Sequence, residues 1–185
     1  MAFSNQVTTL QTYKQYLREI GIVPSAKLES CFACGLPAVW LYLKAIGLED
    51  LYFDMLAGLK KRTALFKELI YLLIFTNGHN TFFPHIPKGF LTNKVPPAVA
   101  AAQVQLAKPS FEMAYEFSRD QLTQVLSAVT QPNYMVRIGN QRKAIGIMCK
   151  DDTYHVYHAN NPRALQFNDI EECVNVIMRV MNERQ

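Results

Sequence analysis

The stretch KAIGIMCKDDTYHVYHANNP, Lys143–Pro162, decides the fold class of this chain. Two short runs, KAIGIMC and TYHVYHA, are rich in apolar, β-branched and aromatic residues, and the acidic pair Asp151-Asp152 lies between them. Such runs favour strands, and Asp is common in tight turns. We therefore predict a β-hairpin here. The segment NYMVRIG, which precedes the hairpin, predicts another strand. The segment NNPRALQF, which follows the hairpin, predicts a turn and a short extension.

Helices are predicted on both sides of this hairpin along the chain. Ser118 and Gln121 have the spacing of a capping box, so a helix is expected to begin after Ser118. The last helix is expected to have Asn168 as its N-cap, with Glu171 three residues on. The segment SFEMAYEFS, which ends at Ser118, alternates well enough to predict a strand. The predicted inner face of the last helix is Ile170, Cys173, Val174, Ile177 and Met181.

The front half of the chain has helical periodicity. Gly21 can end the first helix as its C′ residue, and the stretch SCFACGLPAVWLYLKAIG, Ser30–Gly47, predicts a second helix with Pro37 in its first turn. Trp40 is expected to be a core anchor whose indole N–H finds a partner. The apolar stripes of these two helices are Leu10, Tyr13, Leu17 and Ile20, and Leu36, Val39, Trp40, Leu43 and Ile46. Further helices are expected over Leu48–Lys61 and Ala64–Thr76.

Helices that precede an antiparallel sheet with two added helices indicate an α+β fold. A chain of 185 residues, half of them apolar, predicts a single domain over 1–185. Its helical part covers about 1–76 and its sheet part about 110–185. Between them, 77–109 is rich in Pro, Gly and Asn, which predicts an irregular insertion lying on the surface.

The composition excludes several function classes. Charged residues make up 18% of the chain and the net charge is only +4, which is not typical of a disordered protein or of a nucleic-acid partner. The apolar run Leu69–Phe75 is too short to span a bilayer, so no stable membrane insertion is expected. Four irregularly spaced cysteines and no recognisable signal peptide indicate a reducing, cytoplasmic location. For Cys149 and Cys173 the plain interpretation is packing.

The order of these pieces resembles the papain-like cysteine proteases, specifically the YopT-like group of bacterial effector proteins. The stretch GLPAVWL, Gly35–Leu41, looks like that family's G-L-S-x-x-W-L run. Lys143–Pro162 looks like H-A-I-G-I, a charged turn and Y-x-x-Y-D-x-N, and FNDIEE, Phe167–Glu172, looks like the start of the family's last helix. The resemblance covers most of the chain outside 77–109. It implies a papain-like α+β fold, with a nucleophilic Cys at the start of a buried helix and a His and an Asp supplied by later strands.

All three catalytic positions of that family are changed in this chain. The family's Cys falls at Ala33, its His at Lys143 and its Asp at His158. In the family, a thiolate attacks a carbonyl carbon, the His protonates the leaving amine and the Asp holds the His ring. An ammonium group can pair with a thiolate, but it does not readily shuttle a proton at neutral pH. The resemblance therefore implies a scaffold without its catalytic device.

The leading prediction is a catalytically degenerate protease-like domain that acts by binding another protein, and that is delivered into a host cell if it is an effector. Its contact surface would be the old cleft or the 77–109 insertion. No cofactor and no metal are expected. The alternative is an active cysteine hydrolase or acyltransferase with a peptide substrate, in which Cys34 works with His158 or His155. A third class is a structural module of a longer protein.

The residues of the alternative site also have simpler interpretations. His155 and His158 are three apart on a predicted strand, so their side chains point to opposite faces and only one could face the cleft. Cys34, near the expected helix start, could be a thiolate or a small buried hydrophobe. Cys31 and Cys34 have the spacing of a redox pair, and with the two histidines they have the residue types of a zinc site.

Overall fold

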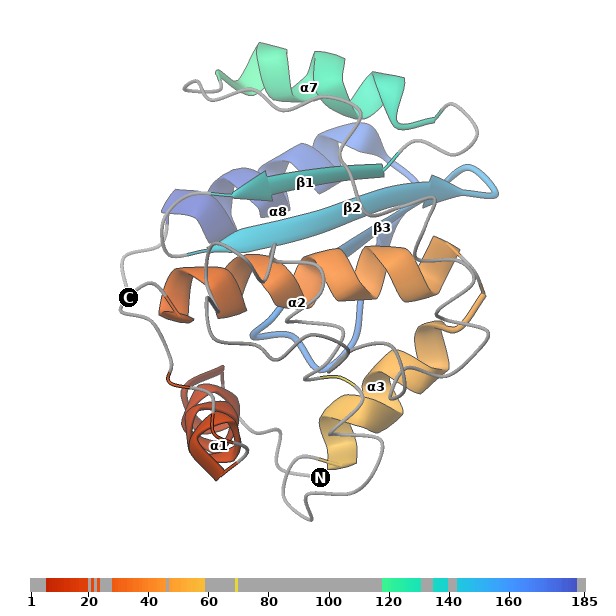
Figure 1. Ribbon diagram of the computed structural model, residues 1–185. Helices are drawn as coiled ribbons and strands as arrows, with labels where there is room; N and C mark the ends of the chain where they lie inside the picture. The colour runs from red at the N-terminus through yellow and green to blue at the C-terminus, as the bar shows by residue number, and fades with distance from the viewer. Residues whose placement is uncertain are drawn as a thin grey trace.

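The structure, a computed structural model, describes residues 6–19, 21, 23, 28–45, 47–58, 69, 118–130, 135–139 and 143–182. In this part of the chain, helices α1, α2 and α3 come first, α7 and a four-stranded antiparallel sheet follow, and α8 comes last. Figure 1 shows α2 in front of the sheet and α8 behind it. The order of elements confirms the α+β class.

The sheet has the strand order β1-β2-β3-β4, and every neighbouring pair is antiparallel. The strands are Met135–Gly139, Ala144–Lys150, Thr153–His158 and Leu165–Phe167. β2 and β3 form the predicted hairpin, and φ is 52° at Asp151 and 57° at Asp152. In a two-residue turn of type I′ both positions have positive φ, which matches the twist of the strands, and Asp tolerates this conformation.

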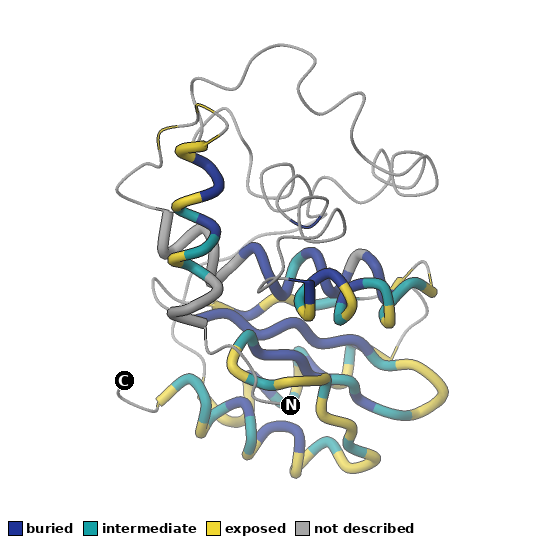
Figure 2. The backbone as a smooth tube through the Cα atoms, turned by 90° about the horizontal axis from the view of Figure 1, so that it is seen from below, coloured by how far each residue is buried: buried dark blue, intermediate teal, exposed yellow. Residues whose placement is uncertain are grey.

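The register separates the sheet into two faces, because residues directly opposite on paired strands point the same way. The α2 face carries Gly146, Met148, His155 and Tyr157, and the α8 face carries Ile145, Ile147, Val156 and His158. β2 is buried from Ala144 to Met148, which means that both faces are covered along most of this strand. The dark blue path of the central strands in Figure 2 shows this burial.

The α2 face is covered by α2 (Leu28–Ala45), which approaches β2 closely at Gly146. A Cβ atom at Gly146 would lie 3.0 Å from both Leu41 Cγ and Trp40 Cε3, and 3.1 Å from the Pro37 carbonyl oxygen. Only glycine leaves room for the helix at this distance. The close approach of α2 to the sheet therefore depends on this one position.

Two further helices, α1 (Gln6–Glu19) and α3 (Glu49–Ala57), pack into the same core as α2. Tyr13 and Leu17 of the predicted stripe of α1 are buried. Gly21 follows α1 with φ of +79°, and its N–H donates to the Arg18 carbonyl oxygen over 3.1 Å. The prediction that Gly21 ends the first helix is confirmed.

The α8 face is covered by α7 (Arg119–Ala128) and α8 (Ile170–Asn182), which share one apolar cluster with the sheet. The capping box is present: Gln121 N–H donates to Ser118 Oγ over 3.3 Å, and Ser118 N–H donates to Gln121 Oε1 over 2.9 Å. All five predicted inner-face residues of the last helix are buried or partly buried in this cluster: Ile170, Cys173, Val174, Ile177 and Met181.

Two predictions about helix starts are wrong. α2 begins at Leu28, so Pro37 lies inside the helix and not in its first turn. Leu28 and Glu29 favour a helix and extend it toward the N-terminus, and the proline removes one hydrogen bond from the interior. α8 is capped by Asp169, whose Oδ1 accepts from Glu171 N–H over 2.9 Å. Asn168 instead accepts a hydrogen bond from Thr153 Oγ1 through its own Oδ1 over 3.2 Å.

Several predictions lie outside the described residues. They are the helix over Ala64–Thr76, apart from Leu69, the insertion over 77–109 and the strand SFEMAYEFS, apart from its last residue Ser118. The helix expected over Leu48–Lys61 is described as α3, with Leu48 as its N-cap and residues from 59 onward outside the description. In the described ranges, every helix is too short or too polar to cross a bilayer.

Candidate functional site

The three positions that the resemblance identifies lie toward one end of the sheet. Pro37 and Trp40 of α2 lie against Gly146, near the start of β2. Lys44, later in α2, lies within electrostatic range of His155, whose register partner Met148 is further along β2. α2 and β2 therefore run in the same direction, as Figure 1 shows. The N-terminal half of α2 consequently lies toward the end where β2 begins and β3 finishes.

Ala33 and Cys34 are in this half of α2, Lys143 directly precedes β2 and His158 is the last residue of β3. Ala33 is four residues before Pro37, which places it about 6 Å further along the helix axis. These positions therefore lie toward the same end of the sheet, but the side chains of Lys143 and His158 are directed to the α8 face, opposite to α2. The side chains of Cys31 and Cys34 lie outside the described residues, so their predicted redox and zinc roles stay predictions.

Lys143 is buried, with an exposed fraction of only 6%, and its side chain points to α8. Its Nζ donates to the Val180 carbonyl oxygen over 2.9 Å. Val180 is in the last turn of α8, where carbonyl groups have no partner within the helix. A lysine at this place both satisfies a carbonyl and complements the negative end of the helix dipole. Lys143 therefore acts as a C-terminal cap of α8.

His158 is buried at the end of β3, and its register partner is Ile145 on the α8 face. Its carbonyl oxygen accepts from Asn161 N–H over 2.8 Å, which closes the turn predicted after the strand. His155 is opposite Met148, so the two histidines point to opposite faces as the sequence predicts. His158 is at the same end of the sheet as Lys143, whereas His155 lies about 10 Å closer to the hairpin turn along the strand.

His155 has a different environment from His158. It is partly buried on the α2 face, and burial lowers the pKa of its imidazole, with the Lys44 ammonium adding to this effect. The Glu49 carboxylate opposes the shift, Lys150 lowers the pKa further and Asp151 raises it. His155 is thus placed near the C-terminal end of α2, away from the half that carries Cys34.

The expected thiolate at Cys34 depends on its distance from the helix start. Cys31 is the fourth residue of α2 and Cys34 is the seventh, because the helix begins at Leu28. The electrostatic effect of a helix N-terminus decreases within the first turn. Cys34 therefore lies in the second turn of α2, further from the helix start than predicted.

Cys149 and Cys173 pack in the cluster on the α8 face. Burial raises the pKa of both thiols, and that of Cys173 rises to about 12. A thiol with a raised pKa is a poor nucleophile at neutral pH. These observations confirm that Cys149 and Cys173 are packing residues. Among the described residues, no group of three side chains could hold a metal ion.

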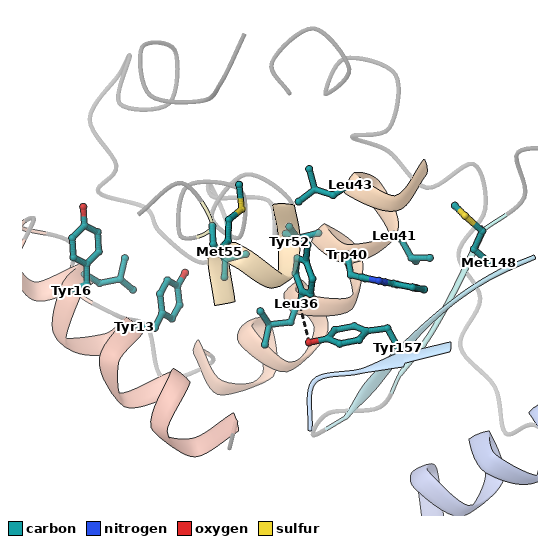
Figure 3. Packing of buried hydrophobic residues seen from close by; sticks show 13 residues of the cluster. Tyr13, Tyr16, Leu36, Trp40, Leu41, Leu43, Tyr52, Met55, Met148 and Tyr157 are labelled. Carbon is teal, nitrogen blue, oxygen red and sulfur yellow. Dashed lines mark hydrogen bonds between the residues drawn. The ribbon is translucent and has the colours of Figure 1, made fainter. Parts of the chain in front are cut away.

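A hydrogen-bonded aromatic group lies between α2, α3 and β3, and the sequence patterns did not predict it. Tyr52 Oη donates to Tyr157 Oη over 3.0 Å, and both rings are fully buried (Figure 3). Burial raises the pKa of both phenols. The Trp40 and Tyr157 rings are 5.4 Å apart. A signal was present in the sequence, since Tyr157 falls in the Y-x-x-Y pattern, but its partner Tyr52 is 105 residues away.

The predicted partner of the Trp40 indole is also in this group. Trp40 is fully buried, and its Nε1 donates to Glu49 Oε1 over 2.9 Å. Lys44 Nζ donates to Glu49 Oε2 over 2.6 Å and lies 5.7 Å from the Trp40 ring centre. Glu49 is the first residue of α3, so its carboxylate joins two helices. The expectation that Trp40 is a core anchor with a satisfied N–H is confirmed.

Comparison of this chain with protein-family models, with curated proteins and with solved structures gave no match. The functional argument therefore depends on the site itself.

Proposed function

We propose that this chain is a catalytically degenerate domain of the papain-like, YopT-like kind, and that it acts by binding another protein. The observation that carries the proposal is the hydrogen bond from Lys143 to Val180. A residue at the position of the family's catalytic His needs a free nitrogen lone pair that can reach a thiol. In this chain the side chain at that position is a cation that stabilises the end of α8.

The other two positions support the same conclusion. Ala33 has no group that can act as a nucleophile. His158 occupies the position of an Asp, so the negative charge that would hold a catalytic imidazole is absent there. A scaffold that keeps its core contacts, such as Gly146 against α2, can still present a surface to a partner. That step from fold to function is an analogy.

The proposed contact surface is the end of the sheet where the N-terminal half of α2, the start of β2 and the turn after β3 meet. In this turn Asn160, Pro162 and Arg163 are exposed. The 77–109 insertion is a second part of the proposed surface, on sequence grounds alone. If the resemblance to effector proteins extends to their use, the partner belongs to a host cell and the protein works in its cytoplasm.

A second candidate function is favoured by one observation. Cys34 and His158, the residues proposed for a thiol hydrolase or acyltransferase, belong to the same end of the sheet, but His158 is on the α8 face whereas α2 covers the opposite face. This candidate requires a Cys34 thiol with a lowered pKa and a His158 imidazole that reaches it. The first candidate requires neither.

The pH dependence of alkylation separates the two candidates. The whole protein is treated with iodoacetamide between pH 5 and 9, and the modification of each cysteine is followed by mass spectrometry. Cys149 is the internal reference, because it is partly buried and its thiol pKa is raised. Cys34→Ser and His158→Ala are the matched variants.

The proposal predicts that Cys34 reacts as an ordinary thiol or not at all, and that His158→Ala leaves its rate unchanged within about twofold. Fast modification of Cys34 near pH 6 that slows at least tenfold in His158→Ala would contradict the proposal. That result would establish a thiolate–imidazolium pair, and a search for a peptide substrate would follow.

A further inference from the structure

His155 contains a buried nitrogen that has no partner. Its Nδ1 is, among the described residues, the one buried side-chain nitrogen or oxygen atom without a hydrogen bond. Buried polar atoms in native proteins are nearly always paired, so such an atom needs an explanation. His155 is on the α2 face, and its register neighbours are Met148 on β2 and Gln166 on β4. None of the proposed binding surface involves this residue.

Charged groups face His155 from the elements packed around it. Lys44 is on α2, Glu49 begins α3, Lys150 ends β2 and Asp151 is in the hairpin turn. The two lysines oppose a positive charge on the imidazole, and the two carboxylates favour it. The neutral imidazole fits this environment. Its Nδ1 can then be the unprotonated nitrogen, which is an acceptor that lacks a donor but carries no buried charge.

Protonation changes this balance at one atom. An imidazolium donates from both nitrogens, so a proton on Nδ1 would be buried without an acceptor. Leaving a charged donor unpaired in the protein interior is costly. The partly buried Glu49 carboxylate is within electrostatic range of His155. Both of its oxygens already accept hydrogen bonds, one from Trp40 and one from Lys44. Glu49 can serve His155 only by giving up one of these contacts.

We propose that His155 is a proton-sensitive switch that, when charged, draws Glu49 away from Trp40 and loosens the junction between α2 and α3. The junction is closed at neutral pH, when the Trp40–Glu49 hydrogen bond and the Lys44–Glu49 ion pair are both present. In mildly acidic solution the carboxylate is shared with the imidazolium. The fold would thereby couple proton uptake at β3 to the contact between two helices.

The direction of the pH effect follows from linkage. Burial lowers the pKa of His155 below its usual value of 6.5, so the unfolded chain binds this proton more readily than the folded chain. The contribution of His155 to the free energy of unfolding is therefore fully present above about pH 7. It decreases as the pH falls below 6.5, and it becomes constant below the pKa of the folded state.

Trp40 is the single tryptophan of the chain, so its fluorescence reports this junction alone. The emission of the full chain is followed from pH 8 to pH 5, and the Hε1 resonance of His155 is titrated by NMR under the same conditions. We expect a shift in Trp40 emission whose midpoint lies below pH 6.5 and coincides with the His155 titration. His155→Gln should abolish the shift, because Gln does not titrate.

His158→Gln is the matched control, since it removes a buried histidine from the same strand on the opposite face. The shift should persist in this variant and in a variant in which the other two histidines of the chain, His79 and His85, are both changed to Gln. The proposal is overturned if the shift survives His155→Gln, if only His158→Gln removes it, or if His155 titrates while Trp40 emission stays constant. The last outcome would mean that Asp151 or solvent accommodates the proton. Should His155→Gln fail to fold, the coincidence of the two wild-type titrations decides the question.

Discussion

The two faces of the sheet are packed with different chemistry. On the α2 face, Trp40, Tyr52 and Tyr157 are fully buried and each takes part in a hydrogen bond. On the α8 face, the buried cluster consists mainly of aliphatic residues with two thiols. Hydrogen bonds require particular distances and directions, whereas aliphatic packing requires mainly the right volume. The difference teaches that directional hydrogen bonds specify the position of α2, whereas the volume of aliphatic side chains mostly specifies the position of α8.

Neighbouring positions of β2 allow a direct comparison of the two faces. Gly146→Val should reduce the free energy of unfolding by about 3 kcal/mol or more, because its side chain would collide with Trp40, Leu41 and the Pro37 carbonyl. Ile147→Val, one residue on and on the opposite face, should cost only about 1 kcal/mol. Urea unfolding of both variants measures the difference. Equal losses would mean that the two faces tolerate changes of volume alike.

The tyrosine pair tests whether hydrogen bonds specify the α2 face. Tyr52→Phe and Tyr157→Phe should each cost about 1–2 kcal/mol, because each leaves the other buried hydroxyl without its partner. The double variant should cost clearly less than the sum of the two, with a coupling energy of about 1 kcal/mol. Strict additivity in a double-mutant cycle would show that the two hydroxyls do not depend on each other.

The smallest expected effect concerns Lys143, a charged residue that is buried on the α8 face. Lys143→Met keeps most of the buried aliphatic stem but removes the hydrogen bond to the Val180 carbonyl, and it should cost about 1 kcal/mol. Amide hydrogen exchange should increase in the last turn of α8 and not in α7. A variant as stable as the wild type, with unchanged exchange, would remove the structural role of Lys143 on which the proposed function depends.

Much of the fold could be predicted because its signals are local. The capping box at Ser118, the turn at Asp151-Asp152 and the end of α1 at Gly21 each involve partners within a few residues. The start of α2 was misplaced because Pro37 was expected in a first turn, whereas Leu28 and Glu29 extend the helix toward the N-terminus. Asn168 and Asp169 are adjacent and both suit an N-cap, so the pattern could not distinguish them.

The site was harder to predict than the fold, because its contacts are long-range. Composition and spacing give no sign that Lys143 bonds to Val180, which is 37 residues away, or that Glu49 holds Trp40 and Lys44 together. The resemblance located the three changed positions, but not the role that Lys143 has taken. His155 was predicted as a candidate acid or base, and only its surroundings distinguish it from His158.

The hydrogen bond between Tyr52 and Tyr157 also has a consequence for the order of folding. It joins residues 105 apart, so forming it closes a loop whose entropy cost is about 4 kcal/mol. Among the described residues, the members of the cluster between the sheet and α8 all come from Leu122 to Met181. We expect the hairpin and its helices to assemble first. The first half of the chain then docks onto a surface that already exists, and the aromatic group closes last.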